Sequence, residues 1–185
     1  MNIAVDIDDT LTDSFDYFMP FAAEFFKTDI SVLNAKNISY SNLPDEWKKD
    51  EIAFCKRYYD RYTADTPFKK DAAKGIKRLK DLGHKIIIIT GRTTDFYTDP
   101  YKTTRKELEN GGIIYDKLIC TLDKAKACRE EKISVLVDDL AANCSAAKNA
   151  GVFPVLFVSR ANKNERCDFC KAESWEDVVK IISKL

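Results

Sequence analysis

The chain has 185 residues and a mass of 21.1 kDa, the size of one domain or of one domain with a modest insertion. With 45% hydrophobic and 32% charged residues, its composition is that of a folded globule and excludes a disordered or fibrous chain. The 30 basic and 30 acidic side chains cancel, so charge alone attracts neither a nucleic acid polymer nor a membrane surface. The longest aliphatic run, 86–89, is far shorter than the ~20 residues that cross a bilayer, and we expect a cytoplasmic protein without a membrane anchor.

Six cysteines, at about 3% of the chain, are too few for a disulfide-stabilised scaffold in a protein that can bury a core. We expect reduced thiols, most of them buried. The six are Cys55, Cys120, Cys128, Cys144, Cys167 and Cys170. Cys167 and Cys170 have the spacing of half a zinc or redox site, but no second pair faces them at ordinary spacing, so we expect no metal there.

The first predicted elements are a short buried strand and a long helical insertion. The strand is the apolar run at 3–5. Residues 14–66 then follow, aromatic, helical in period and without a strand pattern, and they are too many for an ordinary crossover between strands. We therefore predict a helical cap inserted at 14–66 and a core formed by 1–13 and 67–185.

Aromatic side chains dominate this insertion. They are Phe15, Phe18, Phe21, Phe25, Phe26, Tyr40, Trp47, Phe54, Tyr58, Tyr59 and Tyr62. The helical spacing of the first five phenylalanines predicts that they are mainly core. Trp47, Tyr58 and Tyr62 combine a ring with a polar group and are candidates for the wall of a site.

Beyond the insertion, strands and helices alternate to the end of the chain. Apolar runs predict strands at 85–90, 117–120, 133–137 and 152–158. Helices are predicted at 71–82 and 141–150, each followed by a glycine that suits the left-handed residue at a helix end. Ser174 and Asp177 form a capping box that opens a final amphipathic helix. The alternation predicts an α/β fold with a parallel sheet covered by helices on both faces.

Charged and polar side chains follow the predicted strands. In chain order they are Asp6, Asp8 and Thr10, then Thr90, Gly91 and Arg92, then Lys124 at the start of a helix, and finally Asp138 and Asp139. Ligands of open parallel sheets bind at the carboxyl ends of the strands, so we expect these groups to converge. If the chain stays extended after the first strand, Asp6, Asp8 and Thr10 point to the same side.

The acidic groups at this edge favour a divalent cation. Carboxylates held close together repel one another and need a compensating cation or proton. An oxygen-rich set suits a hard ion that keeps several waters, which favours Mg²⁺ over calcium or zinc. A metal, Lys124 and Thr90 would together surround an anion, and phosphate fits such surroundings. The pattern therefore favours phosphate as the bound anion.

The same motifs carry a family resemblance over nearly the whole chain. A strand ending in DxDxT, a strand ending in Thr, a helix opening with Lys and a strand ending in DD, in that order, resemble the haloacid dehalogenase (HAD) superfamily of phosphatases. More narrowly, IAVDIDDTLT, IIIITGR, the Asp123-Lys124 helix start and VLVDDL are similar to the 5'(3')-deoxyribonucleotidase-like branch. The resemblance implies a HAD-like, Rossmann-like three-layer fold with a small C1-type cap after the first strand. It also implies Mg²⁺-dependent hydrolysis of a nucleoside or deoxynucleoside monophosphate.

The resemblance also implies a role for each motif residue. Asp6 would be the nucleophile that forms an aspartyl phosphate. Asp8 would protonate the leaving oxygen and then deprotonate the water that cleaves the intermediate. Thr90 and the amides near Gly91 would hold the phosphoryl oxygens, and Lys124 would neutralise charge in the transition state.

The metal ligands implied by the resemblance are the Asp6 carboxylate, the Asp8 backbone carbonyl and one of Asp138 or Asp139. The sequence does not decide between the last two. Arg92 either contacts the substrate phosphate bidentately or braces the cap.

Several alternatives stay open at this stage. Lys126 is a rival to Lys124, although two residues along a helix turn it to another face. His84 is expected to begin a strand rather than to act in catalysis. The substrate could instead be a sugar phosphate, and a phospho-acceptor signalling module also gathers acids, a Thr and a Lys at parallel strand ends. That module has no place for the insertion and carries its acidic pair on the first strand. The oligomeric state is open, a homodimer included.

Overall fold

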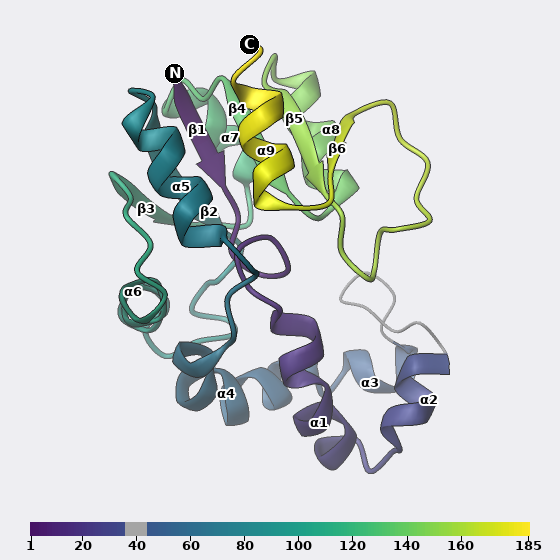
Figure 1. The fold of residues 1–185 in the computed structure, drawn as a ribbon. Coiled ribbons are helices and arrows are strands. Elements are labelled where there is room, and N and C mark those ends of the chain that lie inside the picture. Colours follow the sequence, from purple (N-terminus) through teal and green to yellow (C-terminus); the bar gives the residue numbers. More distant parts are fainter. Residues whose placement is uncertain (36–43) are drawn as a thin grey trace.

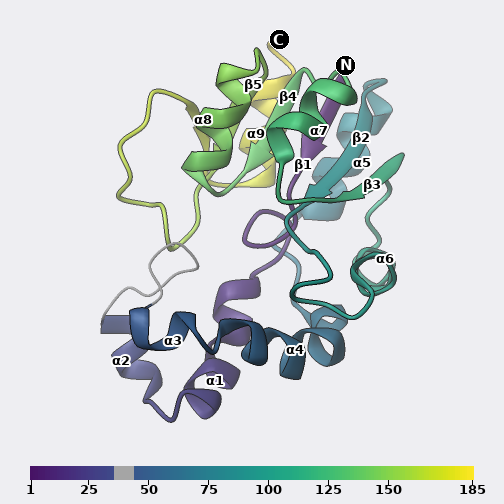
Figure 2. The same ribbon diagram turned by 180° about the vertical axis from the view of Figure 1, so that it is seen from behind.

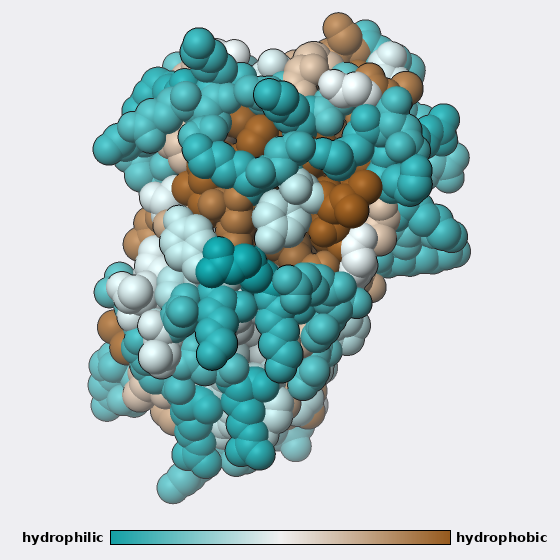
Figure 3. Space-filling view, turned by 90° about the vertical axis from the view of Figure 1, so that its left-hand side faces the viewer, coloured by the Kyte–Doolittle hydropathy of each residue, from teal (hydrophilic) through white to brown (hydrophobic). Residues whose placement is uncertain are grey.

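A computed structural model describes residues 1–35 and 44–185 (Figure 1). The part of the predicted insertion at 36–43, with Tyr40, lies outside the described residues. Within the described part of the chain, no helix has both the length and the apolar character needed to cross a bilayer. Figure 3 shows one side of the molecule, where hydrophilic side chains cover both ends and apolar side chains gather in the middle.

The centre of the fold is a six-stranded sheet in which every neighbouring pair is parallel. Its order is β3-β2-β1-β4-β5-β6. The strands are β1 (Asn2–Val5), β2 (Lys85–Thr90), β3 (Lys117–Cys120), β4 (Val135–Asp138), β5 (Phe153–Phe157) and β6 (Cys170–Ala172). The predicted α/β class and the five predicted strands are confirmed. The edge strand β6 was missed because its three residues, Cys-Lys-Ala, carry no apolar run.

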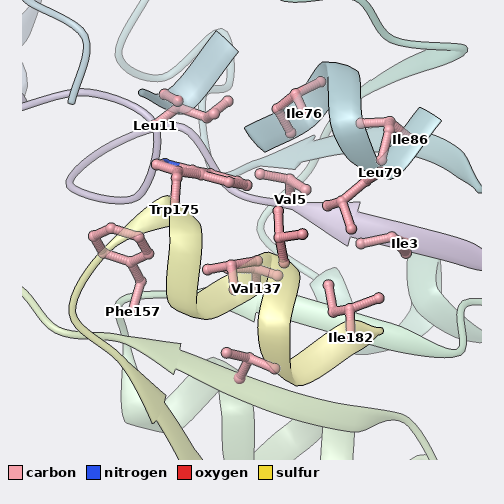
Figure 4. Close-up of a cluster of buried hydrophobic side chains, with 14 of the residues drawn as sticks. Ile3, Val5, Leu11, Ile76, Leu79, Ile86, Val137, Phe157, Trp175 and Ile182 are labelled. Atoms are coloured by element: carbon pink, nitrogen blue, oxygen red, sulfur yellow. The ribbon is translucent and has the colours of Figure 1, made fainter. Parts of the chain in front are cut away.

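Helices cover both faces of the sheet. The helices after the insertion are α5 (Ala72–Asp81), α6 (Pro100–Asn110), α7 (Lys124–Glu130), α8 (Ala141–Asn149) and α9 (Trp175–Ile182). Ile3 and Val5 of β1 pack with α5 and α9 in the larger core cluster, drawn in Figure 4. Ala4, between them, faces the opposite side, in a second cluster with residues of α7 and α8. This alternation makes three layers, helix on sheet on helix (Figure 2).

The predicted helix ends are confirmed at three places. Gly83 and Gly151, just after α5 and α8, have φ of 85° and 80°, which glycine adopts without steric cost. Ser174 accepts a hydrogen bond from the backbone N–H of Asp177, 3.2 Å away, at the start of α9. Helix α6 was not predicted, because its surface is polar and only a few of its side chains are buried.

The insertion forms α1 (Ser14–Phe25), α2 (Ile30–Ala35), α3 (Asp45–Lys48), α4 (Glu51–Tyr62) and the 3-10 turn η1 (Thr63–Asp65). These elements lie together beyond the end of the sheet to which β1 points (Figure 1). The chain enters and leaves the insertion along one short antiparallel bridge between Thr12 and Phe68. Lys69 and Asp13, beside this bridge, form an ion pair of 2.6 Å.

The aromatic side chains of the insertion pack mainly on one another. Phe18, Phe54 and Tyr58 are buried in one cluster, which most of the other rings surround. Trp47 stacks on Phe26 with ring centroids 4.5 Å apart, and Phe21 stacks on Tyr62 at 4.6 Å. The helical spacing of the phenylalanines therefore indicated a real core, which belongs to the insertion itself.

Candidate active site

The first acidic residue continues the line of β1. The backbone N–H of Asp6 donates to the carbonyl of Val137 in β4 across 3.0 Å, and the side chain is buried. The chain then turns sharply, and the N–H groups of residues 10, 11 and 12 all donate to the carbonyl of Ile7. Asp9, inside this turn, has φ of 54°. The expectation that Asp6, Asp8 and Thr10 share one side of an extended chain was therefore wrong.

Lys124 joins two of the predicted carboxylates. Its Nζ lies 2.8 Å from Asp6 Oδ1 and 2.7 Å from Asp138 Oδ2, and the residue is only 6% exposed. Burial opposes the charged ammonium, but attraction to Asp138 and Asp6 outweighs it and raises the pKa of Lys124 above its usual range. Lys126 points elsewhere and pairs loosely with Glu130 at 3.9 Å. The geometry thus favours Lys124 over its rival.

The two consecutive acids after β4 have different surroundings. Asp138 accepts hydrogen bonds from Lys124, from Asn143 Nδ2 at 3.0 Å and from the backbone N–H two residues on at 2.9 Å. The Asp139 carboxylate has one long contact, from Ser159 Oγ at 3.5 Å. Burial and the negative charge of Asp138 raise the pKa of Asp139 well above its usual range. The Asp139 carboxylate is therefore the less satisfied of the two.

Three acids form a cluster with the character of a cation site. Among the described residues, Asp6, Asp138 and Asp139 each offer a carboxylate oxygen within 4.8 Å of the other two. Asp6 Oδ1 is buried, and among the described residues its partner is the Lys124 ammonium, 2.8 Å away. Burial, Asp138 and Asp8 together raise the pKa of Asp6 to about 7 despite that pair. Because the donors are hard oxygens and their charges are undercompensated, the residues fit a divalent cation.

Asp8 is not part of this cluster and pairs instead with Arg92. Arg92 donates from Nε to Asp8 Oδ2 at 3.0 Å and from Nη2 to Asp8 Oδ1 at 2.8 Å. The opposite side of the guanidinium contacts Glu107, from Nη1 and, at 3.2 Å, from Nη2. Burial raises the pKa of Asp8, but Arg92 outweighs it, so that pKa is lowered. In this structure the Arg92 donors are directed to these two carboxylates, and a contact of Arg92 with the substrate phosphate stays a prediction.

Thr90 and Gly91 lie at the end of β2. Thr90 is fully buried, and its Oγ1 has no hydrogen-bond partner among the described residues. A buried hydroxyl without a partner is unfavourable, so this oxygen can bond to a ligand at low cost. Gly91 lines the pocket above the acids.

A pocket of about 260 Å³ opens over the acidic floor. Asp6, Lys124 and Asp139 contribute to its floor, next to Asp8 and Arg92. Its aromatic lining consists of Phe18 and Tyr59 from the insertion and of Phe96 and Tyr97 from the β2–α6 connection. Glu51 and Cys55, one turn apart on α4, also line it. The pocket therefore combines charged groups from the sheet edge with rings from two other segments.

None of the three aromatic residues named as candidates for the wall lines this pocket. Trp47, Tyr58 and Tyr62 do not line this pocket, because their rings pack within the insertion. Phe96 and Tyr97 were missed, although their place just after the Thr90-Gly91-Arg92 strand end could have indicated them. Glu107 was missed because nothing near it in the sequence resembles a motif.

The other candidate groups lie outside the pocket, except one thiol. All six cysteines are free, and three of them, Cys55, Cys128 and Cys144, are buried. Burial raises the pKa of the Cys55 thiol to about 12, so this lining residue stays protonated and unreactive. The described residues contain no metal-type cluster at Cys167 and Cys170. His84 Nδ1 lies 3.2 Å from the N-terminal amino group.

The fold is that of hydrolases of the HAD type. A protein described as a predicted phosphatase from Clostridium acetobutylicum superposes with a TM-score of 0.72 at 17% identity, covering 100% of this chain and 98% of that one. A HAD-like hydrolase from Streptococcus pneumoniae gives 0.69 at 12% identity, with 98% and 97% covered. At these identities the likeness is one of fold.

Residues 1–185 match the family described as 5' nucleotidase, deoxy (pyrimidine), cytosolic type C protein, and the chain belongs to that family. A nucleotidase of Clostridium acetobutylicum is 25% identical over 191 residues, which cover 100% of this chain and 95% of the relative. The resemblance to HAD phosphatases and to their nucleotidase branch is therefore confirmed.

Proposed function

We propose that the protein is a Mg²⁺-dependent phosphomonoesterase that hydrolyses a nucleoside or deoxynucleoside monophosphate through an aspartyl phosphate on Asp6. The observation that carries the proposal is the convergence of Asp6, Lys124 and Asp139 on the floor of a pocket with aromatic walls. The match to a nucleotidase family supports the substrate class. The family description, which names cytosolic proteins, supports a cytoplasmic location.

Asp6 is the nucleophile in this proposal. Its carboxylate attacks the phosphorus, the bond to the leaving oxygen breaks, and the phosphoryl group becomes an acyl phosphate. Lys124, fixed between Asp6 and Asp138, supplies a positive charge at the point where phosphoryl charge accumulates. Thr90 Oγ1 and the backbone N–H groups near Gly91 hold the phosphoryl oxygens.

The cation would be held by the carboxylates of Asp6 and Asp139 and by the backbone carbonyl of Asp8. Asp139 is preferred over Asp138 because the Asp138 oxygens already accept several hydrogen bonds, while Asp139 has one long contact. Asp138 then serves to orient Lys124. When bound, Mg²⁺ would neutralise the phosphate and reduce the repulsion between it and the acids.

Asp8 is the general acid and base. Arg92 lowers the pKa of Asp8, but the negative phosphate of a bound substrate acts in the opposite direction, so that Asp8 takes up a proton from solvent when the substrate binds. It donates this proton to the leaving oxygen and later takes one from the water that cleaves the aspartyl phosphate. Asp8 lines the same pocket as Asp6, and its pairing with Arg92 fixes the direction of its carboxylate.

The leaving nucleoside would lie against the aromatic walls. Rings from the insertion and from the β2–α6 connection face one space, and flat bases stack well on such rings. We assign residues 14–66 as the cap and 1–13 with 67–185 as the catalytic core, because Phe18 and Tyr59 come from the former and the charged groups from the latter.

Phosphate release from a panel of substrates tests the proposal. Deoxynucleoside and ribonucleoside 5'-monophosphates are compared with hexose and pentose phosphates, each with Mg²⁺ and with EDTA. We expect kcat/KM for the best nucleotide to exceed that for every sugar phosphate by at least about tenfold, a difference of about 1.4 kcal/mol in transition-state binding. Faster release from a sugar phosphate would reject the nucleotide assignment, and full activity in EDTA would reject the metal.

A further inference from the structure

Glu107 is a buried acid that none of the sequence motifs includes. It lies on α6, far along the chain from the acidic motifs, and its exposed fraction is 0%. Its carboxylate contacts Arg92 through both oxygens. Burial raises the pKa of Glu107 to about 7 even though the positive charge of Arg92 opposes this.

Arg92 links this acid to the pocket. Two edges of its planar guanidinium are used. Nε and Nη2 donate to Asp8, and Nη1 and Nη2 donate to Glu107, so each carboxylate receives two contacts. Arg92 itself is 3% exposed. Two-contact pairing with a planar group fixes orientation as well as distance. The plane of Arg92, and with it the Asp8 carboxylate, is therefore held from the side of Glu107.

Stability alone is a weak reason for such an arrangement. Removing ions from water costs several kcal/mol for each, and well-packed apolar side chains often stabilise a core equally well. Two carboxyl groups, Asp8 and Glu107, share the single guanidinium of Arg92, and of these two acids only Asp8 lines the pocket. The pairing is better explained by its effect on the Asp8 carboxylate, which it holds in one orientation.

The same group of residues also contacts the segment that leaves the insertion. The Arg92 guanidinium lies 5.7 Å from the centre of the Tyr97 ring, and the Tyr97 hydroxyl lies 3.4 Å from Thr63 Oγ1 in η1. Asn110, at the end of α6, donates to the carbonyl of Ala64 across 2.8 Å. Helix α6 is thus fixed to η1, and this contact restrains the position of Glu107 beside Arg92.

We propose that Glu107 is a positioning residue that, through Arg92, holds the Asp8 carboxylate in the direction needed for proton transfer to the leaving oxygen. The inference rests on the role given to Asp8 in the proposed function. Without the charge of Glu107, Arg92 keeps one carboxylate partner and can turn with it. Asp8 then meets the leaving oxygen less often in a productive geometry.

The test separates proton transfer from folding and from binding. One substrate is a deoxynucleoside 5'-monophosphate, whose alkoxide leaving group needs a proton. The other is the same nucleotide with sulfur in the bridging 5' position, whose thiolate leaves without one. The two substrates have the same base and sugar and should bind alike. Because kcat/KM includes every step up to departure of the leaving group, comparing it between them isolates the effect of a substitution on protonation of the leaving group.

We expect Glu107→Gln to lower kcat/KM for the oxygen-bridged nucleotide by about tenfold or more, a fraction of the full effect of a general acid, and to leave the sulfur-bridged one within about threefold. Glu109→Gln, an exposed position on the same helix, is the matched control and should change neither. Equal losses on both substrates, or no loss, would overturn the inference. If the wild type hydrolyses neither nucleotide, the proposed function fails instead.

Arg92→Lys provides a second route if circular dichroism shows that Glu107→Gln is unfolded. Lysine keeps the positive charge but not the planar fork, so it cannot hold Asp8 and Glu107 in fixed directions. We expect the same selective loss on the oxygen-bridged nucleotide. A uniform loss on both substrates would contradict the inference.

Discussion

Lys124 Nζ donates to Asp138 Oδ2 across 2.7 Å, and this buried contact connects the start of α7 to the end of β4. This contact distinguishes two neighbouring acids that look equivalent in the sequence. Asp138 accepts hydrogen bonds from Lys124 and Asn143, whereas among the described residues the Asp139 carboxylate has one long contact, from Ser159. Substitution of Asp139 should therefore affect metal binding, whereas substitution of Asp138 should affect stability.

Replacing each acid by its amide tests that difference. We expect Asp139→Asn to raise the Mg²⁺ concentration for half-maximal activity by about tenfold or more, because a ligand charge is lost. Asp138→Asn leaves a buried ammonium with one partner fewer, and should lower the free energy of unfolding by about 3 kcal/mol. Mg²⁺ titrations of activity and urea unfolding measure the two effects. A larger shift in Mg²⁺ requirement for Asp138→Asn would reverse the assignment.

Phe96 offers a test of the aromatic wall. Phe96→Ala removes a ring that lines the pocket without touching the acidic floor, so it should raise KM for the best nucleotide by about tenfold, the effect of one lost base stack. The rate at saturation should change little. Phe169→Ala is the control, because Phe169 is also half-buried and does not line the pocket. An unchanged KM for Phe96→Ala would remove stacking on this ring from the account.

Gly75 has a structural reason to lack a side chain. A Cβ there would lie 2.9 Å from Trp175 Cε3, and Trp175 is held in the core, where its Nε1 donates to the carbonyl of Thr10 at 3.2 Å. Alanine normally stabilises a helix relative to glycine by about 0.8 kcal/mol. Overpacking here should outweigh that gain and leave Gly75→Ala destabilised by about 1 kcal/mol.

Urea unfolding of Gly75→Ala measures this change. The control is Arg78→Ala, an exposed position on the same helix, which should shift the unfolding free energy by less than about 0.5 kcal/mol. A Gly75→Ala protein more stable than the wild type would show that Trp175 can move aside.

Asp6 allows a change that keeps its shape and removes its nucleophile. Asp6→Asn is nearly isosteric, so we expect a folded protein with less than about 1% of the wild-type turnover, in line with losses seen when nucleophiles are removed. Far-ultraviolet circular dichroism confirms the fold, and phosphate release measures the rate. Residual turnover well above that level would argue for another nucleophile.

The sequence predicted the sheet edge well because parallel strands are short apolar runs whose ends carry the polar groups. Asp6, Lys124 and the Asp138–Asp139 pair were all found in this way, and the structure brings them together. Asp8 was harder, because the turn at Ile7 breaks the two-residue period on which the prediction depended. The orientation of the Asp8 side chain depends on this turn and on its hydrogen bonds with Arg92.

The partners of Arg92 and the rings of the pocket could not be predicted from spacing. Helical periodicity identifies a buried face but does not say which other element covers it, so Trp47, which packs on Phe26, and Phe18, which lines the pocket, could not be told apart as core and wall. Glu107 meets Arg92 only because α6 packs beside the end of the sheet, a long-range contact. The sequence shows only that Arg92 follows a predicted strand; its burial, which requires an acidic partner, is seen in the structure.

Chemical trapping of Asp6 tests the central claim most directly. The wild-type protein is quenched with borohydride while it turns over its best nucleotide in the presence of Mg²⁺. Borohydride reduces an aspartyl phosphate to homoserine, and the masses of the peptides are then measured by mass spectrometry. We predict homoserine at position 6, dependent on substrate and absent from Asp6→Asn. Turnover without homoserine at position 6, or with homoserine in place of another aspartate, would contradict the assignment of Asp6 as the nucleophile.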